Sequence, residues 1–567
     1  MSFRLLRAAR GSALLLVLPC AALAQERELL RDHIARYEAD RGALRRRYEL
    51  PLSARYGERM RAFHAELIAA LDALPFEDLP PSEQLDWLLL RRHVQNAEAE
   101  RVRDALVDEE LRSLLPFAAE VLALEERRRE FEPLNPERAA EACVRIAEVA
   151  AGVQRELDGG KHAGTAPKLG ARAAERSGEL RRALRQWFRF YDGYDPLFTW
   201  WVAKPYEAAD QALEKHERAV RAKLVDVAGD ASLIGDPIGE AALRVALDHE
   251  LIPYSSAELV AIAEREFAWC DAEMEKAASE LGYPGEWRKA QEAVKRLHVA
   301  PGEQPRMIRD LAREAIAFVK ERDLLTIPPL AEETWRMSMM SPEAQRTNPY
   351  FLGGEVIQVS FPTASMTHAE KLQSLRSNNE HQARATVHHE LIPGHHLQQF
   401  MTARHRPWRQ LFDTPFWVEG WALYWEFRLW ELGLAKSPAD RIGFLFWRKH
   451  RCARIVFSLA FHSGKWNARQ CVEYLVERVG HEPAAAEAEV RRSVAGAYGP
   501  LYQAAYMLGG LQIRSLHREL VERGGWSEKR FHDAVLRENA IPIALLRATL
   551  RGDALTRDFD PRWRFAD

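Results

Sequence analysis

Apolar residues recur along most of the chain at the three- and four-residue spacing of a helix face. Residues 63–74 follow this spacing, and Pro75 then ends the element. Segments rich in Arg, Glu, Ala and Leu at 139–157 and 171–187 predict further helices with solvated charged faces. The pattern therefore predicts a mainly α fold without a repeat period. Breaks are expected at Gly159-Gly160, around Pro196 and at 235–237.

One segment past the middle of the chain departs from the helical pattern. Residues 355–361 read Glu-Val-Ile-Gln-Val-Ser-Phe, between Gly353-Gly354 and Pro362. A β-branched run between turn residues predicts a short strand. The favoured interpretation is a small structural hairpin. The alternative is an edge where Val356 and Gln358 bind an extended peptide substrate.

The length of the chain, 567 residues, allows more than one domain. We expect an N-terminal helical region over residues 25–330 and a C-terminal catalytic helical region over 331–567, joined in one continuous fold. Aromatic clusters are usually part of a core, with some members lining a cleft. The tryptophans expected there include Trp200-Trp201, Trp417, Trp421 and Trp425.

The first residues resemble a targeting segment. Arg4, Arg7 and Arg10 precede an apolar run at 13–18 and a small-residue end, Ala22-Leu23-Ala24. This order predicts a secretory signal peptide over residues 1–24, cut after Ala24, and therefore an exported protein, periplasmic or secreted. Lipid attachment at Cys20 is a minor alternative, because Pro19 precedes it. No later apolar stretch is long enough to span a bilayer.

Composition excludes several classes of function. A formal charge of -3 gives no positive field for nucleic acid. The remaining cysteines, Cys143, Cys270, Cys452 and Cys471, form no C-x-x-C pair, which argues against a thiolate zinc site and against thioredoxin chemistry. The chain also lacks the G-x-S-x-G elbow of serine hydrolases and the Walker A pattern of nucleotide-binding proteins.

Residues 385–398 hold the candidate chemistry, with four histidines and a glutamate, Glu390, within nine positions. Imidazole is a common metal ligand, and a glutamate beside such a ligand can take a proton from a metal-bound water. In the common zinc motif H-E-x-x-H, the second histidine follows the first by four residues. Here Pro393 stands four residues after His389, and the next candidates are His395 and His396.

Neither pair fits a regular helix. Six residues rotate about 600°, which points His395 away from His389, and seven residues rise about 10.5 Å. A break at Pro393-Gly394 could bring one histidine back, because proline removes a helical donor and glycine permits unusual backbone angles. His395 needs the smaller distortion, so we prefer it to His396. The alternative is a set of surface or capping histidines around an ordinary kink.

A third ligand is expected on the next apolar helix, which starts near Thr414-Pro415. Glu419 and Glu426 lie seven residues apart on it. Carboxylates on such a face are costly unless they are paired or bound to metal. Either could complete the site, and a structural salt-bridge network is the alternative.

The run His-Glu-x-x-Pro-Gly-His-His-Leu-Gln, followed by Glu-Gly-Trp-Ala-Leu-Tyr, resembles the bacterial domain-of-unknown-function family 885. That family is similar to the gluzincin metallopeptidases, which include angiotensin-converting enzyme and the carboxypeptidase Taq family. The resemblance implies a large helical fold with a deep cleft and one zinc ion per chain. It implies His389, His395 and Glu419 as ligands and Glu390 as general base.

Further segments extend this resemblance. Residues 461–466 and 502–509 are similar to two short family regions. They imply that Tyr506 stabilises an oxyanion and that His462 and Arg492 contact the transition state or a substrate carboxylate. Packing and salt bridging remain equal alternatives for the last two. The predicted function is an exported zinc-dependent peptidase, of carboxypeptidase or oligopeptidase type, acting on short or unfolded peptides. The alternatives are a zinc amidase on small conjugates and a non-catalytic binding protein with a vestigial site.

Overall fold

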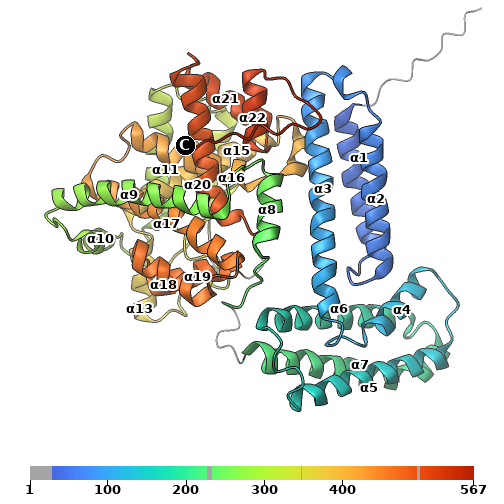
Figure 1. Cartoon of the computed structure of the whole chain (residues 1–567). Helices are drawn as coiled ribbons and strands as arrows, with labels where there is room; N and C mark the ends of the chain where they lie inside the picture. The colour runs from blue at the N-terminus through green and yellow to red at the C-terminus, as the bar shows by residue number, and fades with distance from the viewer. Residues whose placement is uncertain (1–28, 227–232, 347, 495–497, 567) are drawn as a thin grey trace, which may run out of the picture.

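The computed structural model describes residues 29–226, 233–346, 348–494 and 498–566, and its elements are helices apart from two short strands. The expected mainly α class is confirmed. Figure 1 shows a large C-terminal body and an N-terminal part that stands beside it. The signal peptide predicted over residues 1–24, including Cys20, lies outside the described residues. Within the described part, no helix is long and apolar enough to cross a membrane.

The N-terminal part begins with three helices that stand together in Figure 1. They are α1 (Leu30–Arg47), α2 (Ala54–Asp72) and α3 (Pro81–Glu110), with a short turn η1 (Phe76–Asp78). The helix predicted over 63–74 is confirmed, since α2 ends close to Pro75. The apolar faces of these helices pack into the core of the body. This shared core includes residues from Leu30 to Phe565.

A lobe of four helices follows, at the lower right of Figure 1. It contains α4 (Ala118–Arg129), α5 (Pro136–Asp158), α6 (Pro167–Tyr191), α7 (Pro196–Val220) and the π-turn η2 (Arg221–Val225). Its buried residues, all between 111 and 224, form a core of their own. The helices predicted at 139–157 and 171–187 are confirmed as parts of α5 and α6.

The expected burial of Trp200 and Trp201 is wrong. Trp200 is 83% exposed and Trp201 is 44% exposed. On α7 the buried face is set by Phe198 and Val202, and the two tryptophans between them project outward. By contrast, Trp417, Trp421 and Trp425 are fully buried, as expected.

The body is built from the remaining helices. Those before its strands are α8 (Glu240–His249), α9 (Ser256–Glu280), α10 (Trp287–Lys295), α11 (Gln304–Glu321) and α12 (Pro329–Thr334). Those after its strands are α13 (His368–Ser377), α14 (Glu380–Glu390), α15 (His395–Thr402), α16 (Pro415–Glu431), α17 (Pro438–His462), α18 (Ala468–Val479), α19 (Pro483–Val494), α20 (Tyr502–His517), α21 (Glu528–Glu538) and α22 (Ile543–Arg551). Short helical turns at η5 (Ala344–Arg346), η6 (Pro407–Phe412) and η7 (Arg518–Glu522) complete the described part of the body.

The predicted strand is present as β2 (Val356–Val359) and pairs in parallel with β1 (Arg336–Met339). The pair is therefore a parallel ladder and no hairpin. On its other side, the N–H and C=O of Gln358 both bond to Leu352, at 2.8 and 3.1 Å. The protein itself thus occupies the edge position of Gln358 that an extended substrate would need.

Two close helix approaches set the geometry of the body. A Cβ on Gly509 of α20 would lie 2.0 Å from the carbonyl oxygen of Phe416 in α16, so only glycine fits there. In the same way, a Cβ on Gly443 of α17 would lie 2.1 Å from the carbonyl oxygen of His381 in α14. These contacts bring α14, α16, α17 and α20 together around the candidate site.

Candidate metal centre

The two halves of the histidine motif lie on separate helices, because α14 ends at Glu390 and α15 begins at His395. Gly394 makes this break possible, since a Cβ there would lie 1.8 Å from the carbonyl oxygen of His389. Its N–H bonds to the carbonyl of His388 at 3.0 Å, and the peptide bond before Pro393 is cis. As a result, the rings of His389 and His395 are 4.8 Å apart and nearly perpendicular.

Three predicted ligands converge on one point. Nε2 of His395 lies 3.2 Å from Oε2 of Glu419, and Nε2 of His389 lies 3.6 Å from the same oxygen. All three side chains are buried. His396 lies elsewhere, with its ring nitrogens 2.8 Å from the carbonyl oxygen of Ala331 and 3.3 Å from that of Gly354. The structure therefore brings His395, and not His396, to His389 and Glu419.

The far nitrogen of each histidine also has a partner. Nδ1 of His389 lies 2.7 Å from Oε1 of Glu426, and Nδ1 of His395 lies 3.2 Å from Oε1 of Gln398. Gln398 is itself held by its amide donating to the carbonyls of Trp417 and Val418. Proteins fix metal-binding imidazoles in this way, so that the other ring nitrogen faces the ion. Glu426, the second carboxylate of the apolar helix, thus supports a ligand.

The electrostatics of the three groups suit a cation. Burial alone would lower the pKa of His395, but the Glu419 carboxylate outweighs it and raises that pKa to about 9. Burial opposes ionisation of Glu419, and His395 and His389 nevertheless hold its pKa well below the usual range. Two imidazole nitrogens and one carboxylate are the donor set of many catalytic zinc sites. The residues present therefore fit a divalent ion such as zinc.

Glu390 lies beside this centre in a cavity of about 280 Å³. Burial raises the pKa of Glu390, with His389 and His395 acting in the opposite direction. The loop through Gly353 closes over it, and a Cβ on that glycine would lie 2.6 Å from Cα of Glu390. The cavity is lined by His389, His395, Glu419, the loop at 350–353, and side chains from α14 to α20.

Two tyrosines of α20 reach the centre. The hydroxyl of Tyr502 donates a hydrogen bond to Oε1 of Glu419. The Tyr506 ring stacks against His389 with centroids 6.1 Å apart, and it also lines the cavity. Tyr502 was missed by the sequence analysis. Its position four residues before Tyr506 was the available signal, because residues four apart share a helix face.

Not every predicted site residue reaches the cavity. Arg492 and Gln358 line it, whereas Val356 and His462 do not. His462 is buried at the end of α17 against Phe461, and burial lowers its pKa to about 4. The structure therefore does not bring His462 to the metal ligands.

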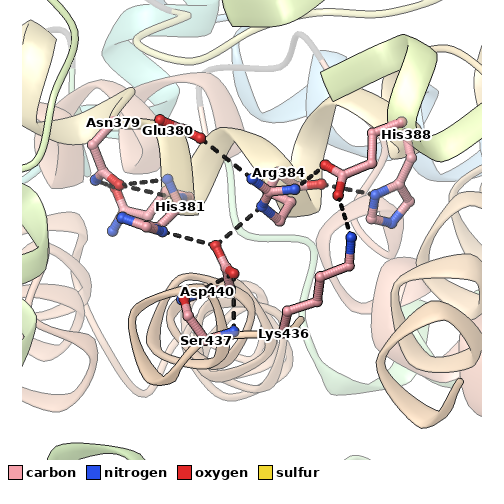
Figure 2. Close-up of polar contacts among 10 residues, drawn as sticks. Asn379, Glu380, His381, Arg384, His388, Lys436, Ser437 and Asp440 are labelled. Carbon is pink, nitrogen blue, oxygen red and sulfur yellow. Dashed lines mark hydrogen bonds and ion pairs between the residues drawn. The ribbon is translucent and has the colours of Figure 1, made fainter. Parts of the chain in front are cut away.

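The orientation of α14 is fixed by Asp440 at the start of α17, as Figure 2 shows. Its Oδ1 lies 2.8 Å from Nδ1 of His381 and accepts from Nε of Arg384 at 3.0 Å. Its Oδ2 accepts from Ser437, which caps α17. Burial opposes ionisation, but these partners keep the Asp440 pKa below its usual value. One carboxylate thus ties the helix that carries His389 to α17, which carries Arg451 and Arg454 of the cavity.

Solved structures similar to this chain include two that are titled as a "putative lipoprotein". One, of unknown function and from Shewanella oneidensis, is 15% identical, with a TM-score of 0.65 over 93% of this chain and 100% of that one. The other, from Colwellia psychrerythraea, is 16% identical, with a TM-score of 0.59 over 92% and 98%. At these identities the likeness shows a shared fold.

A search of curated proteins gives no match. The model of one family, described as bacterial protein of unknown function (DUF885), matches residues 39–550. The chain therefore belongs to the DUF885 family.

Proposed function

We propose that this protein is a zinc-dependent peptidase that hydrolyses short or unfolded peptides. The observation that carries the proposal is the convergence of His389 and His395 on one oxygen of Glu419, inside a cavity that Glu390 also lines. A binding site alone has no need of a base at that position, whereas hydrolysis does. Membership of the gluzincin metallopeptidases is part of the same proposal.

In this mechanism, a bound zinc ion supplies Lewis acidity and lowers the pKa of a water molecule towards about 7. Glu390 accepts a proton from the attacking water and gives it to the leaving amine. Its raised pKa makes it a stronger base than an exposed carboxylate. Tyr502 holds Glu419 in place, and its O–H is committed to that carboxylate. Tyr506 is thus the tyrosine left to donate to the oxyanion.

The small cavity also suits a second candidate, a zinc amidase acting on modified amino acids or small conjugates. A volume of about 280 Å³ is at the lower end of the usual range for ligand pockets, roughly 300–1,000 Å³. The same residues would perform the same proton transfers on either substrate. Assays with short peptides and with N-acyl amino acids separate the two.

We also propose that the protein is exported. The residues of the predicted signal peptide support this, and the two solved structures named above carry the word lipoprotein in their titles. Mass spectrometry of the mature protein from its native host should give an N-terminus at Gln25. An unprocessed Met1 in the mature protein would contradict export by this segment.

The test of the metal site is metal content by mass spectrometry on purified protein. We expect about one zinc per wild-type chain, lost in His389→Ala and in Glu419→Ala. His388→Ala is the matched control. Nδ1 of His388 bonds to the carbonyl of Arg384, so we expect that His388, although it is next to His389, does not bind the metal. Glu390→Gln should keep the zinc and lose peptide hydrolysis by at least about 10²-fold. A wild-type protein that binds no zinc, or a Glu390→Gln variant that stays active, would refute the proposal.

A further inference from the structure

The wall of the cavity also carries three buried arginines. Arg451 and Arg454 come from α17 and Arg492 from α19, and each is at most 7% exposed. Buried guanidinium groups are costly unless anions compensate them. The carboxylates nearest to them are Glu426 and Glu489. Three guanidinium groups thus share two carboxylates in these ion pairs, in a cavity that Glu390 and Glu419 also line.

Both carboxylates already have other partners. Glu426 is shared between Arg451, at 3.2 Å, and His389. Glu489 accepts from Nε and Nη2 of Arg454 at 2.8 and 2.6 Å, whereas Nε of Arg492 is 3.9 Å away. Both contacts of Arg454 fall on Oε1 of Glu489, whereas its Oε2 accepts no hydrogen bond from any described residue and is too far from Arg492 to use that donor.

Glu489 is also fixed in place from behind. His450 lies 3.7 Å from it and bonds to His481 at 2.9 Å, and His481 bonds to the hydroxyl of Tyr350 at 2.8 Å. Burial lowers the pKa of His481 to about 3, so this chain of rings adds no charge at neutral pH. The position of the arginines is thus built into the fold.

Two of these guanidinium groups have donors to spare. Nη1 of Arg454 is buried and has no hydrogen-bond partner among the residues that the structure describes. Nη2 of Arg492 donates to the hydroxyl of Tyr498 at 3.1 Å, and its buried Nε has no hydrogen-bond partner in the described part of the chain. Planar guanidinium forks match a carboxylate, which can accept two parallel hydrogen bonds.

We propose that Arg454 and Arg492 bind the C-terminal carboxylate of a peptide substrate, so that the enzyme cleaves close to a free C-terminus. This inference rests on the proposed peptidase function and names its substrate class. A C-terminal carboxylate would accept hydrogen bonds from the unused donors of both arginines, whereas the backbone of an internal peptide segment offers only neutral carbonyls.

The distances set where the cleaved bond lies. The Tyr506 ring is 6.1 Å from the His389 ring and 4.2 Å from the guanidinium carbon of Arg454. An extended chain advances about 3.3–3.6 Å per residue. A carboxylate on Arg454 therefore leaves room for roughly one to three residues before the metal ligands.

The test compares the tripeptide Ala-Ala-Ala with its C-terminal amide on the zinc-loaded enzyme. We expect kcat/KM for the acid to exceed that for the amide by on the order of 10²-fold, because the amide leaves buried cations uncompensated. Arg492→Gln should lower kcat/KM for the acid alone and reduce the ratio to within about 3-fold, while Arg492→Lys keeps part of it. The control is Arg448→Gln, which removes another buried arginine of α17 that pairs with Glu266 outside the cavity.

Calorimetric titration of both peptides into the Glu390→Gln protein separates this inference from the proposed function. Binding of the acid without hydrolysis by the wild type would refute the peptidase and support the carboxylate site. Hydrolysis of both peptides at equal rates would refute the carboxylate site and support the peptidase. An Arg492→Gln variant that loses activity on the acid and on the amide equally would also refute the carboxylate site. If neither peptide is bound or cleaved, both proposals fail.

Discussion

The cavity region of the body and the α4–α7 lobe use charged and aromatic residues in opposite ways. In the cavity region, Arg451, Arg454, Glu419 and Glu426 are buried. Three tryptophans of α16 are buried with them: Trp417, Trp421 and Trp425. In the lobe, ion pairs such as Arg181–Asp210 remain partly exposed. Exposed aromatic residues gather at the lobe instead: Phe131, Phe190, Tyr194, Trp200 and Trp201.

This difference separates stability from function. Surface ion pairs of the lobe contribute about 0–1 kcal/mol each, and its stability rests on its apolar core. Buried charges cost stability unless their partners are complete. The body accepts that cost around one cavity, where the proposed reaction would use these charges. The lobe is thus an ordinary amphipathic bundle, and the body concentrates its buried charges around the candidate metal centre.

The largest expected effect is a loss of stability when a buried leucine is removed from either core. Comparing the two losses tests whether the lobe is independent of the candidate site. Leu184→Ala in α6 removes a side chain that is 1% exposed in the lobe core. We expect a loss of about 2–5 kcal/mol in the free energy of unfolding, from lost burial and the remaining cavity. Because the two cores are separate, zinc affinity should not change. Denaturant unfolding and a zinc titration measure the two quantities.

The matched variant is Leu423→Ala in α16, a fully buried residue one helical turn after Glu419. Its loss of stability should be similar. Because Leu423 packs where α16 meets α20, zinc affinity should fall as well. If Leu184→Ala weakens zinc binding as much as Leu423→Ala does, the lobe is coupled to the site and the comparison fails.

The second effect concerns pH. The carboxyl of Glu250 accepts a hydrogen bond from Thr414, yet burial raises its pKa to about 7. Between pH 4.5 and 7, the folded protein keeps this proton after the unfolded chain has lost it. Stability therefore falls as pH rises through that window, by about 3 kcal/mol in total. In the lobe, a hydrogen bond from Arg181 lowers the pKa of Asp210, so that group gives no such loss.

Glu250→Gln should remove this loss, because an amide does not ionise. We expect the variant to gain about 3 kcal/mol relative to the wild type between pH 4.5 and pH 7.5. Unfolding by urea at both pH values measures the gain. An equal difference at the two pH values would show that Glu250 does not keep its proton in the folded protein.

The sequence predicted the parts of this arrangement that local patterns determine. Periodicity predicted the helices, and Pro393-Gly394 predicted the break that brings His395 towards His389. Long-range packing was not readable, because the contact of Gly509 with Phe416 joins segments about 90 residues apart. That contact decides which tyrosines reach Glu419. Trp200 was misjudged for a related reason: its residue type favours burial, but its position on α7 has nothing to cover it.

The third effect tests the different roles of the two carboxylates on α16, with Glu419 as a predicted ligand and Glu426 as the partner of His389. Glu426→Gln keeps the shape of the side chain and removes the charge beside Nδ1 of His389. Partners of this kind change metal affinity by about 10–100-fold when they are altered. We expect a loss of that size in a competition titration with a zinc chelator. Asp210→Asn, a carboxylate change in the lobe, is the control and should have no effect on zinc.

The smallest effect tests the exposed aromatic residues of the lobe. Trp200→Ser should change the free energy of unfolding by less than about 0.5 kcal/mol, because the side chain is 83% exposed and supports no core. Trp421→Phe in the body is the contrast. It should cost about 1–3 kcal/mol, since the buried indole N–H donates to the carbonyl of Pro393 at 2.9 Å. Thermal and denaturant unfolding of both variants decide the point. A large loss in Trp200→Ser would mean that this tryptophan packs against another part of the protein in solution.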